Sequence, residues 1–147
     1  MKCRTVIDKD REEEVVIYVH EKSTLSSEIE EFVLGRSLEL LGYKDKNIVK
    51  LLPSDVYCFI VEDNRVYAVC ENERFQIKQR LYLLETMLDK DFVKINQSCI
   101  ANIRKIAKFD ASITGTLMVN FKNGYKDYVS RRQLKIVKEI IKERMSF

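Results

Sequence analysis

The sequence has little of what marks several classes of protein. Its 147 residues include one proline and four glycines, which excludes collagen-like, linker-rich and low-complexity chains. Its apolar runs are far shorter than the roughly 18 residues that a transmembrane helix needs. The first residues, Met1 to Arg4, lead into an acidic stretch without the apolar segment of a secretory signal. We therefore expect a cytoplasmic protein.

Ligands for a metal are also scarce. The chain has a single histidine, His20, and its four cysteines contain no C-x-x-C pair. Because a structural zinc site needs four Cys or His ligands, usually in close pairs, we expect no metal and no cofactor. We expect the cysteines to be small buried thiols. No nucleophile elbow or phosphate-loop glycine pattern accompanies the histidine, so we do not expect an enzyme.

The net charge of +3 hides an uneven distribution. Residues 1–45 carry 7 basic and 11 acidic side chains, whereas residues 46–147 carry 19 basic and 12 acidic ones. The excess is concentrated in residues 92–147, with 12 basic against 4 acidic side chains. Such clustering is typical of a protein that binds a polyanion, and a solvated basic face without a partner is the alternative.

The first third of the chain predicts a small α/β lobe. Residues 3–8 are short and mixed, and residues 15–19 are β-branched and aromatic, so both predict strands. A helix is predicted from the N-cap signal at Ser23 to a terminator at Gly35, and extended structure resumes at residues 38–43. One apolar face of this helix is formed by Leu25, Ile29, Phe32 and Val33.

From residue 46 the pattern changes to many short strands with two helices. The strands are predicted at residues 48–52, 56–61, 65–70, 74–78, 92–96, 100–106, 116–121 and 125–129. The helices are predicted over Leu81 to Leu88 and from Ser130 onward, where Gln133 completes a capping-box pattern. Asn123-Gly124 predicts a hairpin turn with positive φ at both residues. The predicted fold class is α+β, mainly β, with domains at 1–45 and 46–147.

Three blocks of sequence, in order, resemble one family. They are DVYCFIVEDNRVY at residues 55–67, FVKINQSCIANIRKI at residues 92–106, and FKNG with YVSRR at residues 121–132. Together they resemble the LytTR DNA-binding domain, a β-rich module of bacterial transcription regulators, over residues 46–147. The family usually carries His or Arg near Asn96 and often an aromatic residue or His at the position of Arg65. Residues 1–45 do not resemble the phosphoacceptor receiver that often precedes this domain.

The resemblance implies a sequence-specific regulator that reads successive major grooves of duplex DNA through loops. Arg132 occupies the family's position for a base-reading arginine, and arginine pairs in a bidentate manner with guanine. Asn96 and Gln97 are candidates for reading adenine, and Arg65 is a third candidate reader. The other DNA-binding candidates are Ser98 and Arg131, together with Lys94, Arg104, Lys105, Ser130 and Lys135 as phosphate contacts.

Each candidate has a structural alternative. Asn96 and Gln97 are also compatible with turn residues that bond their own backbone, and Asn102 is expected to be such a residue. We expect the start of the last helix and the two polar turns, near Arg65 and Gln97, to form one continuous cationic rim. Six aromatic residues are expected in the core: Tyr57, Phe59, Tyr67, Phe75, Phe92 and Phe121.

The expected partner is double-stranded DNA, bound at tandem repeat sites. An RNA-binding or protein-interaction module of the same fold is the alternative, because aromatic side chains on a sheet stack on unpaired bases. A homodimer is compatible with the sequence, as is a membrane protein that regulates the N-terminal lobe. The residues do not choose between activation and repression.

Overall fold

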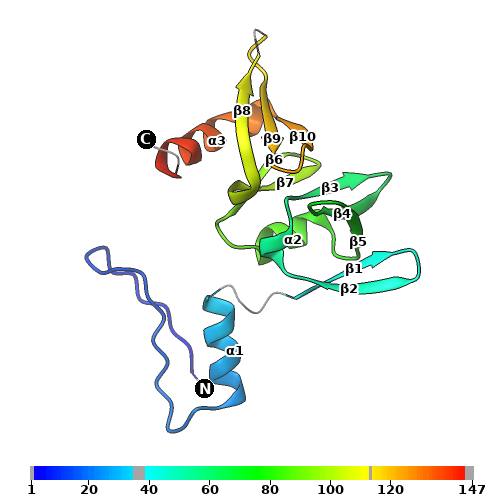
Figure 1. Ribbon diagram of the computed structural model, residues 1–147. Helices are drawn as coiled ribbons and strands as arrows, with labels where there is room; N and C mark the ends of the chain where they lie inside the picture. Colours follow the sequence, from blue (N-terminus) through cyan, green and yellow to red (C-terminus); the bar gives the residue numbers. More distant parts are fainter. Residues whose placement is uncertain (1, 35–38, 113, 145–147) are drawn as a thin grey trace. The chain divides into compact units, whose positions relative to one another are not determined.

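The computed structural model describes residues 2–34, 39–112 and 114–144 and divides the chain into two units, Met1–Ser37 and Leu38–Phe147. In the first unit, helix α1 (Thr24–Val33) follows an extended segment (Figure 1). The predicted N-cap is confirmed, because the Ser23 hydroxyl accepts a hydrogen bond from the Ser26 backbone N–H at 3.1 Å. The predicted terminator Gly35 lies outside the described residues.

The two strands predicted in the first unit are wrong. Segments 3–8 and 15–19 form no strand, although their β-branched residues favour extended backbone. A strand is stable only when a neighbour satisfies its backbone groups and covers its side chains, and these segments have no neighbour among the described residues. Their side chains are exposed accordingly, Tyr18 to 91%.

The second unit contains two antiparallel sheets. The larger sheet has the order β2-β1-β5-β4-β3-β7-β6, and the smaller one has the order β10-β9-β8. The strands of the larger sheet are β1 (Leu40–Lys44), β2 (Asn47–Leu51), β3 (Cys58–Glu62), β4 (Arg65–Val69), β5 (Arg74–Ile77), β6 (Phe92–Asn96) and β7 (Cys99–Asn102). The remaining elements are η1 (Pro53–Asp55), α2 (Leu81–Met87), η2 (Ile103–Lys105), β8 (Ile106–Ala111), β9 (Leu117–Phe121), β10 (Lys126–Val129) and α3 (Arg131–Arg144). The prediction of a β-rich fold is confirmed.

Strand β1 differs from its predicted place. The sequence assigned residues 38–43 to the N-terminal lobe, and Leu38 lies outside the described residues. The structure pairs β1 with β2, with Leu40 opposite Leu51, and with β5. The strand therefore completes the large sheet of the second unit, where Leu40 is fully buried.

The strand predicted over residues 100–106 is interrupted. Strand β7 ends at Asn102, whose side chain donates to the Val56 carbonyl at 2.8 Å and accepts from the Arg104 N–H at 3.1 Å. This side chain caps the 3₁₀ turn η2, after which β8 enters the smaller sheet. The expectation that Asn102 is a structural turn residue is confirmed, and β8 is a strand that the sequence did not predict.

The hairpin turn at Asn123-Gly124 forms, but only one of the two positive φ angles predicted for it is present. Only Gly124 has a positive φ, +91°. The Gly124 N–H donates to the Phe121 carbonyl at 3.0 Å, and the Asn123 side chain accepts from the Tyr125 N–H at 3.0 Å. Asn123 therefore stabilises the turn through its side chain and leaves the left-handed position to glycine.

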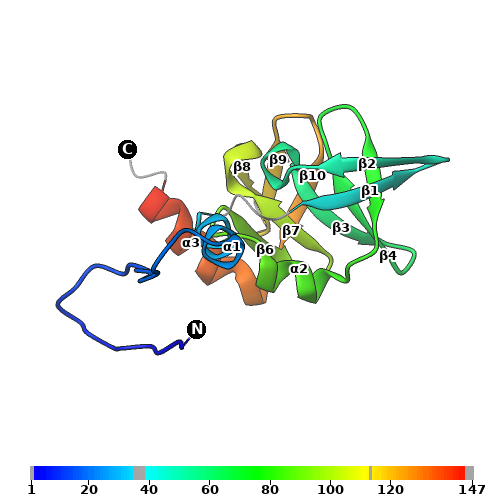
Figure 2. The same cartoon turned by 90° about the horizontal axis from the view of Figure 1, so that it is seen from below.

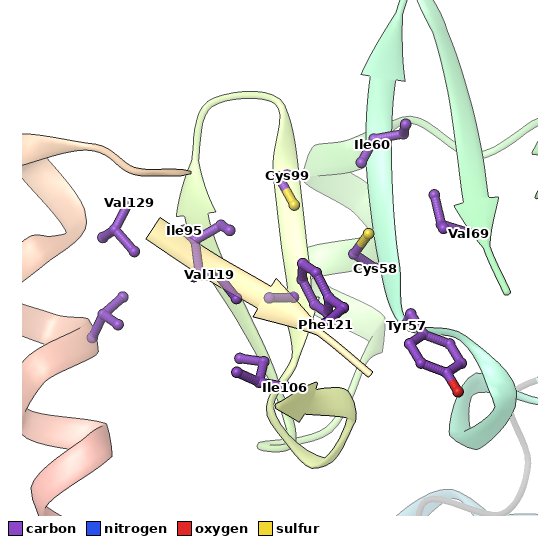
Figure 3. Close-up of a cluster of buried hydrophobic side chains, with 12 residues drawn as sticks. Tyr57, Cys58, Ile60, Val69, Ile95, Cys99, Ile106, Val119, Phe121 and Val129 are labelled. Carbon is purple, nitrogen blue, oxygen red and sulfur yellow. The ribbon is translucent and has the colours of Figure 1, made fainter. Parts of the chain in front are cut away.

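Strand β3 is buried on both faces and separates two apolar clusters. Its alternate residues Cys58 and Ile60 belong to the first cluster together with Phe121 of β9 (Figure 3). Val137 of α3 is a member of the same cluster. Phe59 belongs to the second cluster, which lies against α2. Of the six aromatic residues expected in the core, Tyr57, Phe59, Phe75 and Phe121 are buried, and Tyr67 and Phe92 pack against the clusters.

Helix α3 contacts β6 and β10, and Figure 2 shows it at the side of the sheets away from β1 and β2. The predicted helix is confirmed, and its apolar face points inward, with Val137 buried and Leu134 and Ile141 packed against the first cluster. A hydrogen bond with the Cys58 thiol and burial raise the pKa of Cys99, so this thiol stays neutral in the core. Within residues 2–34, 39–112 and 114–144, no helix has the length and apolarity to cross a membrane.

Gly42 of β1 gives a test of this packing. A Cβ atom at this position would lie 2.7 Å from Leu51 Cδ1 and 2.7 Å from Phe75 Cβ. We expect Gly42→Ala to lower the free energy of unfolding by about 1–3 kcal/mol, because overpacking forces backbone shifts. Urea unfolding measures the change, and Lys50→Ala on exposed β2 is the control, expected within about 0.5 kcal/mol of the parent. Equal stability of the two variants would contradict the close β1–β5 packing.

Candidate nucleic-acid interface

Two polar turns lie side by side at one end of the large sheet. The β3–β4 turn is a two-residue hairpin in which Asp63 and Asn64 have φ of 52° and 60°, as in a type I′ turn. The β6–β7 turn contains Gln97 and Ser98, both exposed. The Val61 N–H donates to the Ser98 carbonyl at 2.9 Å. This bond brings the second turn beside the end of β3, two residues before the first turn.

Asn96 fixes the β6–β7 turn. Its side-chain NH₂ donates to Asp127 Oδ1 at 3.0 Å and to the Tyr128 carbonyl at 2.8 Å, and its Oδ1 accepts from the Ser98 N–H at 2.8 Å. The residue is 2% exposed. Its prediction as a base reader is therefore corrected, because the amide is buried and both of its N–H donors are used inside the protein.

The partner of Asn96 is itself held in place. Besides Asn96, Asp127 accepts from the Tyr128 N–H at 2.8 Å. Burial raises the pKa of Tyr125, so its phenol stays protonated and faces Asp127 Oδ2 at 3.5 Å. Asp127 is not among the candidates from the sequence. A single acidic residue in a strand does not indicate, from its neighbours in the sequence, that it will bond an asparagine 31 residues away.

The start of α3 lies beside the same turn. The Ser130 N–H donates to the Ile95 carbonyl at 2.8 Å, one residue before Asn96. Arg131 and Arg132, in the first turn of α3, are exposed, as is Lys135 one turn later. The structure thus brings together the three segments of the expected rim. We name the cationic rim as residues 63–65, 97–98 and 130–132.

One acidic group beside the rim, Glu62, is engaged elsewhere, whereas Asp63 of the rim itself is exposed at the tip of the hairpin. Glu62 stands opposite Arg65 in the β3–β4 register, yet its Oε2 lies 2.7 Å from Arg74 Nη1. The hydrogen bond from Arg74 lowers the pKa of Glu62 and keeps the carboxylate ionised. Among the described residues, Arg65 has no ion pair, so its guanidinium is available to an external acceptor.

Lys94 lies near the rim but is partly engaged. It is half-buried, and its Nζ is 3.9 Å from Oε2 of Glu85 on α2. Lys94, Arg65 and Gln97 line the same open groove, of about 720 Å³, beside the β3–β4 turn. The groove also contains Lys78 and Arg80, which the sequence analysis did not single out. Their only sequence signal is the basic run Lys78-Gln79-Arg80 between a strand and a helix.

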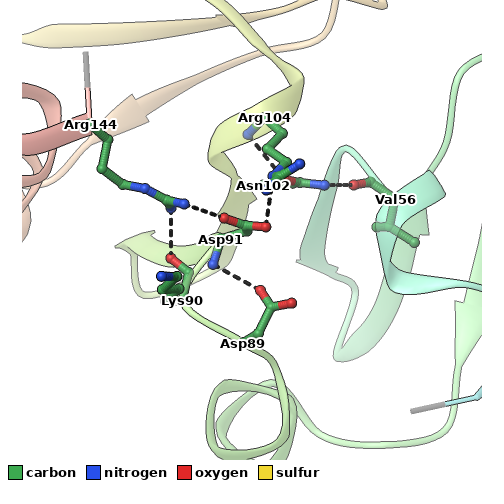
Figure 4. A network of polar contacts seen from close by, with 7 residues as sticks. All are labelled: Val56, Asp89, Lys90, Asp91, Asn102, Arg104 and Arg144. Atoms are coloured by element: carbon green, nitrogen blue, oxygen red, sulfur yellow. Dashed lines mark hydrogen bonds and ion pairs between the residues drawn. The ribbon is translucent and has the colours of Figure 1, made fainter. Parts of the chain in front are cut away.

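Arg104 and Lys105 are not part of this arrangement. They lie in η2, at the opposite end of β7 from Gln97 and Ser98. Four strand residues span about 13 Å. Arg104 Nε is 2.9 Å from Asp91 Oδ2, and Arg144 contacts the other carboxylate oxygen and the Lys90 carbonyl (Figure 4). Lys105 Nζ lies 5.1 Å from the centre of the Tyr57 ring. The Arg104 side chain is 75% exposed, so the roles of Arg104 and Lys105 as DNA contacts stay predictions outside this arrangement.

Most of the aromatic residues expected in the core are not available for stacking. Tyr57, Phe59, Phe75 and Phe121 are buried, and Tyr67 and Phe92 are partly buried against the clusters, so these side chains are poorly placed for unpaired bases. The described residues also bring no three His, Cys, Asp or Glu side chains into a metal-like group. The candidate interface therefore consists mainly of arginine, lysine, amide and hydroxyl groups on turns and at a helix start, with the exposed carboxylate of Asp63 at the tip of one turn.

Comparisons with known proteins agree on one family. Residues 46–142 match the LytTr DNA-binding domain. An uncharacterized HTH-type transcriptional regulator of Staphylococcus aureus (strain NCTC 8325) is 39% identical over 106 residues, which are 72% of this chain and 72% of that protein. A protein of the same description from Staphylococcus aureus (strain COL) gives the same identity and coverage.

A solved structure supports the fold. The LytTr DNA-binding domain of a protein from Bacillus cereus superposes with a TM-score of 0.66 at 20% sequence identity, covering 70% of this chain and 95% of that one. The relatives' description mentions a helix-turn-helix. In the part of the second unit that is described, α2 stands between β5 and β6 and α3 follows β10, so no helix-turn-helix occurs there.

Substitutions at the neighbouring residues Asn96 and Gln97 test whether the buried Asn96 amide stabilises the fold. We expect Asn96→Ala to lower the free energy of unfolding by about 1–3 kcal/mol, because it leaves buried partners of the amide unsatisfied. Gln97→Ala, at an exposed turn position, is the matched control and should stay within about 0.5 kcal/mol of the parent. Thermal or urea unfolding measures both. Similar losses in the two variants would contradict the role assigned to the Asn96 amide.

Proposed function

Because this chain belongs to the LytTR family of DNA-binding domains, we propose that it is a transcription regulator that reads a specific duplex sequence through the cationic rim. The observation that carries the proposal is the pair of backbone hydrogen bonds, Val61 to Ser98 and Ser130 to Ile95. These bonds hold two turns and a helix start next to each other. The coarser statement, that residues 46–142 are a DNA-binding domain of a bacterial regulator family, is the premise.

The rim offers groups suited to base edges. Arg132 and Arg131 project from the exposed first turn of α3, and Arg65 projects from the β3–β4 hairpin. An arginine fork matches O6 and N7 of guanine, and the exposed amide of Gln97 matches N6 and N7 of adenine. Because these groups lie on separate segments, we propose that they enter successive major grooves instead of placing one recognition helix in a single groove.

The phosphate contacts follow from the same arrangement. Lys94 and Ser98 lie in β6 and the β6–β7 turn, Ser130 precedes α3, and Lys135 lies one turn into that helix, and we propose these four residues as phosphate contacts. Contacts of this kind fix the register of a protein on the duplex without specifying sequence. Arg104 and Lys105 are left out of the rim, because they lie at the other end of β7, where their cations are near Asp91 and the Tyr57 ring.

A DNA-binding regulator of a bacterial family must reach chromosomal DNA, so we propose a cytoplasmic location. A role for the first unit remains a prediction, either in homodimerisation or in docking a membrane-protein regulator. Its net acidic charge makes it a poor contact for DNA.

Arg132→Ala tests the reading role. After selection of bound duplexes from a random pool, we expect the variant to lose about 1–3 kcal/mol of affinity for the selected duplex and to relax discrimination at one base pair. Lys138→Ala, an exposed cation further along α3, is the control with unchanged discrimination. Binding by fluorescence anisotropy checks both. An Arg132→Ala variant that keeps full discrimination at every position would remove this residue from the readers.

Tandem binding predicts a defined stoichiometry. We expect two copies of the chain on a duplex with two half-sites about one helical turn, or roughly 10 base pairs, apart. Inserting about 5 base pairs between the half-sites rotates one to the opposite side of the duplex and should abolish joint binding. Sedimentation of the complexes measures the number of copies. Equal joint binding at both spacings would exclude a contact between the two bound copies.

A further inference from the structure

The groove beside the β3–β4 turn is the strongest charged feature outside the cationic rim. It is lined by residues from three places: Asn64 and Arg65 of the hairpin turn, the stretch from Gln76 to Arg80, and Lys94 with Gln97. Four cations and four side-chain amides face it, and none of the described residues that line it carries a carboxylate. Val61, Val66, Ile77, Leu81 and Tyr82 complete the lining. The groove is open, about 720 Å³ in volume, and combines four cations with no carboxylate, which favours an extended anion.

The cations of the groove differ in how far the protein engages them. Lys94 faces Glu85 at 3.9 Å, and Lys78 Nζ lies 4.6 Å from the centre of the Tyr43 ring. Arg80 is exposed, and its side chain makes no capping hydrogen bond to α2. Among the described residues it has no ion pair, like Arg65 across the groove. Lys78 has no ion pair there either, so Arg65, Arg80 and Lys78 are the groove cations without a carboxylate partner among the described residues.

The nearest acidic side chains do not neutralise them. Glu85 is directed to Lys94, and Glu62 is held by Arg74 at 2.7 Å. Asp63 lies at the exposed tip of the hairpin turn and does not line the groove. The floor and walls of the groove are therefore electropositive, which attracts a polyanion and raises its local concentration.

We propose that this groove holds the sugar-phosphate backbone of the DNA strand next to the rim, with Arg80 and Lys78 as phosphate contacts. The inference rests on the proposed function, because it extends the same interface. Arg65 and Gln97 belong both to the rim and to the groove lining, so a duplex read at these residues has its backbone within reach of the groove. The contact lengthens the footprint beyond the three segments of the rim toward β5 and α2.

A phosphate contact differs from a base contact in what its loss does. It lowers affinity for every sequence by a similar factor, and it reduces the steepness with which binding falls as salt rises. Each phosphate that is no longer neutralised lowers the slope of log affinity against log salt by about 0.9 for duplex DNA. This signature separates the proposed role of Arg80 from a reading role.

The experiment uses the full chain with a duplex selected from a random pool and a scrambled duplex of equal length. Fluorescence anisotropy is measured over a salt series for the parent, Arg80→Ala, Arg80→Lys and Lys46→Ala. We expect Arg80→Ala to bind both duplexes about fivefold to tenfold more weakly, with a lower salt slope and an unchanged ratio between the duplexes. Arg80→Lys keeps the charge and should retain most of the affinity. Lys46→Ala, an exposed cation at the β1–β2 turn, should match the parent.

The outcomes separate this inference from the proposed function. If the parent binds the selected duplex and Arg80→Ala binds it equally well with the same slope, the groove contact is wrong and the rim proposal stands. If Arg80→Ala changes the ratio between the duplexes, Arg80 reads sequence and the phosphate role is wrong. If the parent binds no duplex, the proposed function fails and this inference fails with it. Thermal unfolding of each variant verifies that the fold is kept.

Discussion

The buried amide of Asn96 is the interaction on which the candidate interface depends. It joins the β6–β7 turn to β10 through two hydrogen bonds and closes the turn itself with a third, from the Ser98 N–H. The next residue of the chain, Gln97, is exposed. The bond from Ser130 to Ile95 continues the connection to α3. A flexible turn and a separate helix would each have to be ordered on binding, at a cost in conformational entropy. In this protein the turn and the helix start are already ordered by folding, so the rim is organised before any ligand binds.

Asn102 shows why part of the fold was readable from the sequence and part was not. Its expected role in a turn rests on local chemistry, since Asn side chains bond backbone groups two residues away, as this one does with Arg104. Its bond to the Val56 carbonyl crosses 46 residues, and no local pattern reports it. For the same reason a continuous strand was predicted where the chain leaves one sheet for the other. Period-two patterns predicted most strands, and long-range side-chain bonds decided where they stop.

The first unit shows the opposite failure, in which local preference had no long-range support. The run from Val15 to Val19 is rich in β-branched residues, yet without a partner strand it forms none. The helix was predictable because its hydrogen bonds are local and its cap is a single residue, Ser23. The candidate site residues also divide into those that local sequence predicts and those that depend on a distant residue. The exposure of Arg131 and Arg132 was expected, but the burial of Asn96 depends on Asp127, which is distant in sequence.

The net charge of the second unit is a poor guide to its interface, because some of its arginines are engaged in internal ion pairs and others are not. The second unit contains seven arginines, and three of them are tied to carboxylates: Arg104 and Arg144 share Asp91, and Arg74 pairs with Glu62. In residues 39–112 and 114–144, the arginines without an ion pair are Arg65, Arg80, Arg131 and Arg132. All four lie on the cationic rim or in the adjoining groove. A charge count treats the seven alike, whereas only a guanidinium without an internal partner can offer its full fork of donors to a phosphate or a guanine. Carboxylates engage the other three arginines, so the guanidinium groups without an ion pair in the described part of this unit are those of the rim segments and the groove lining.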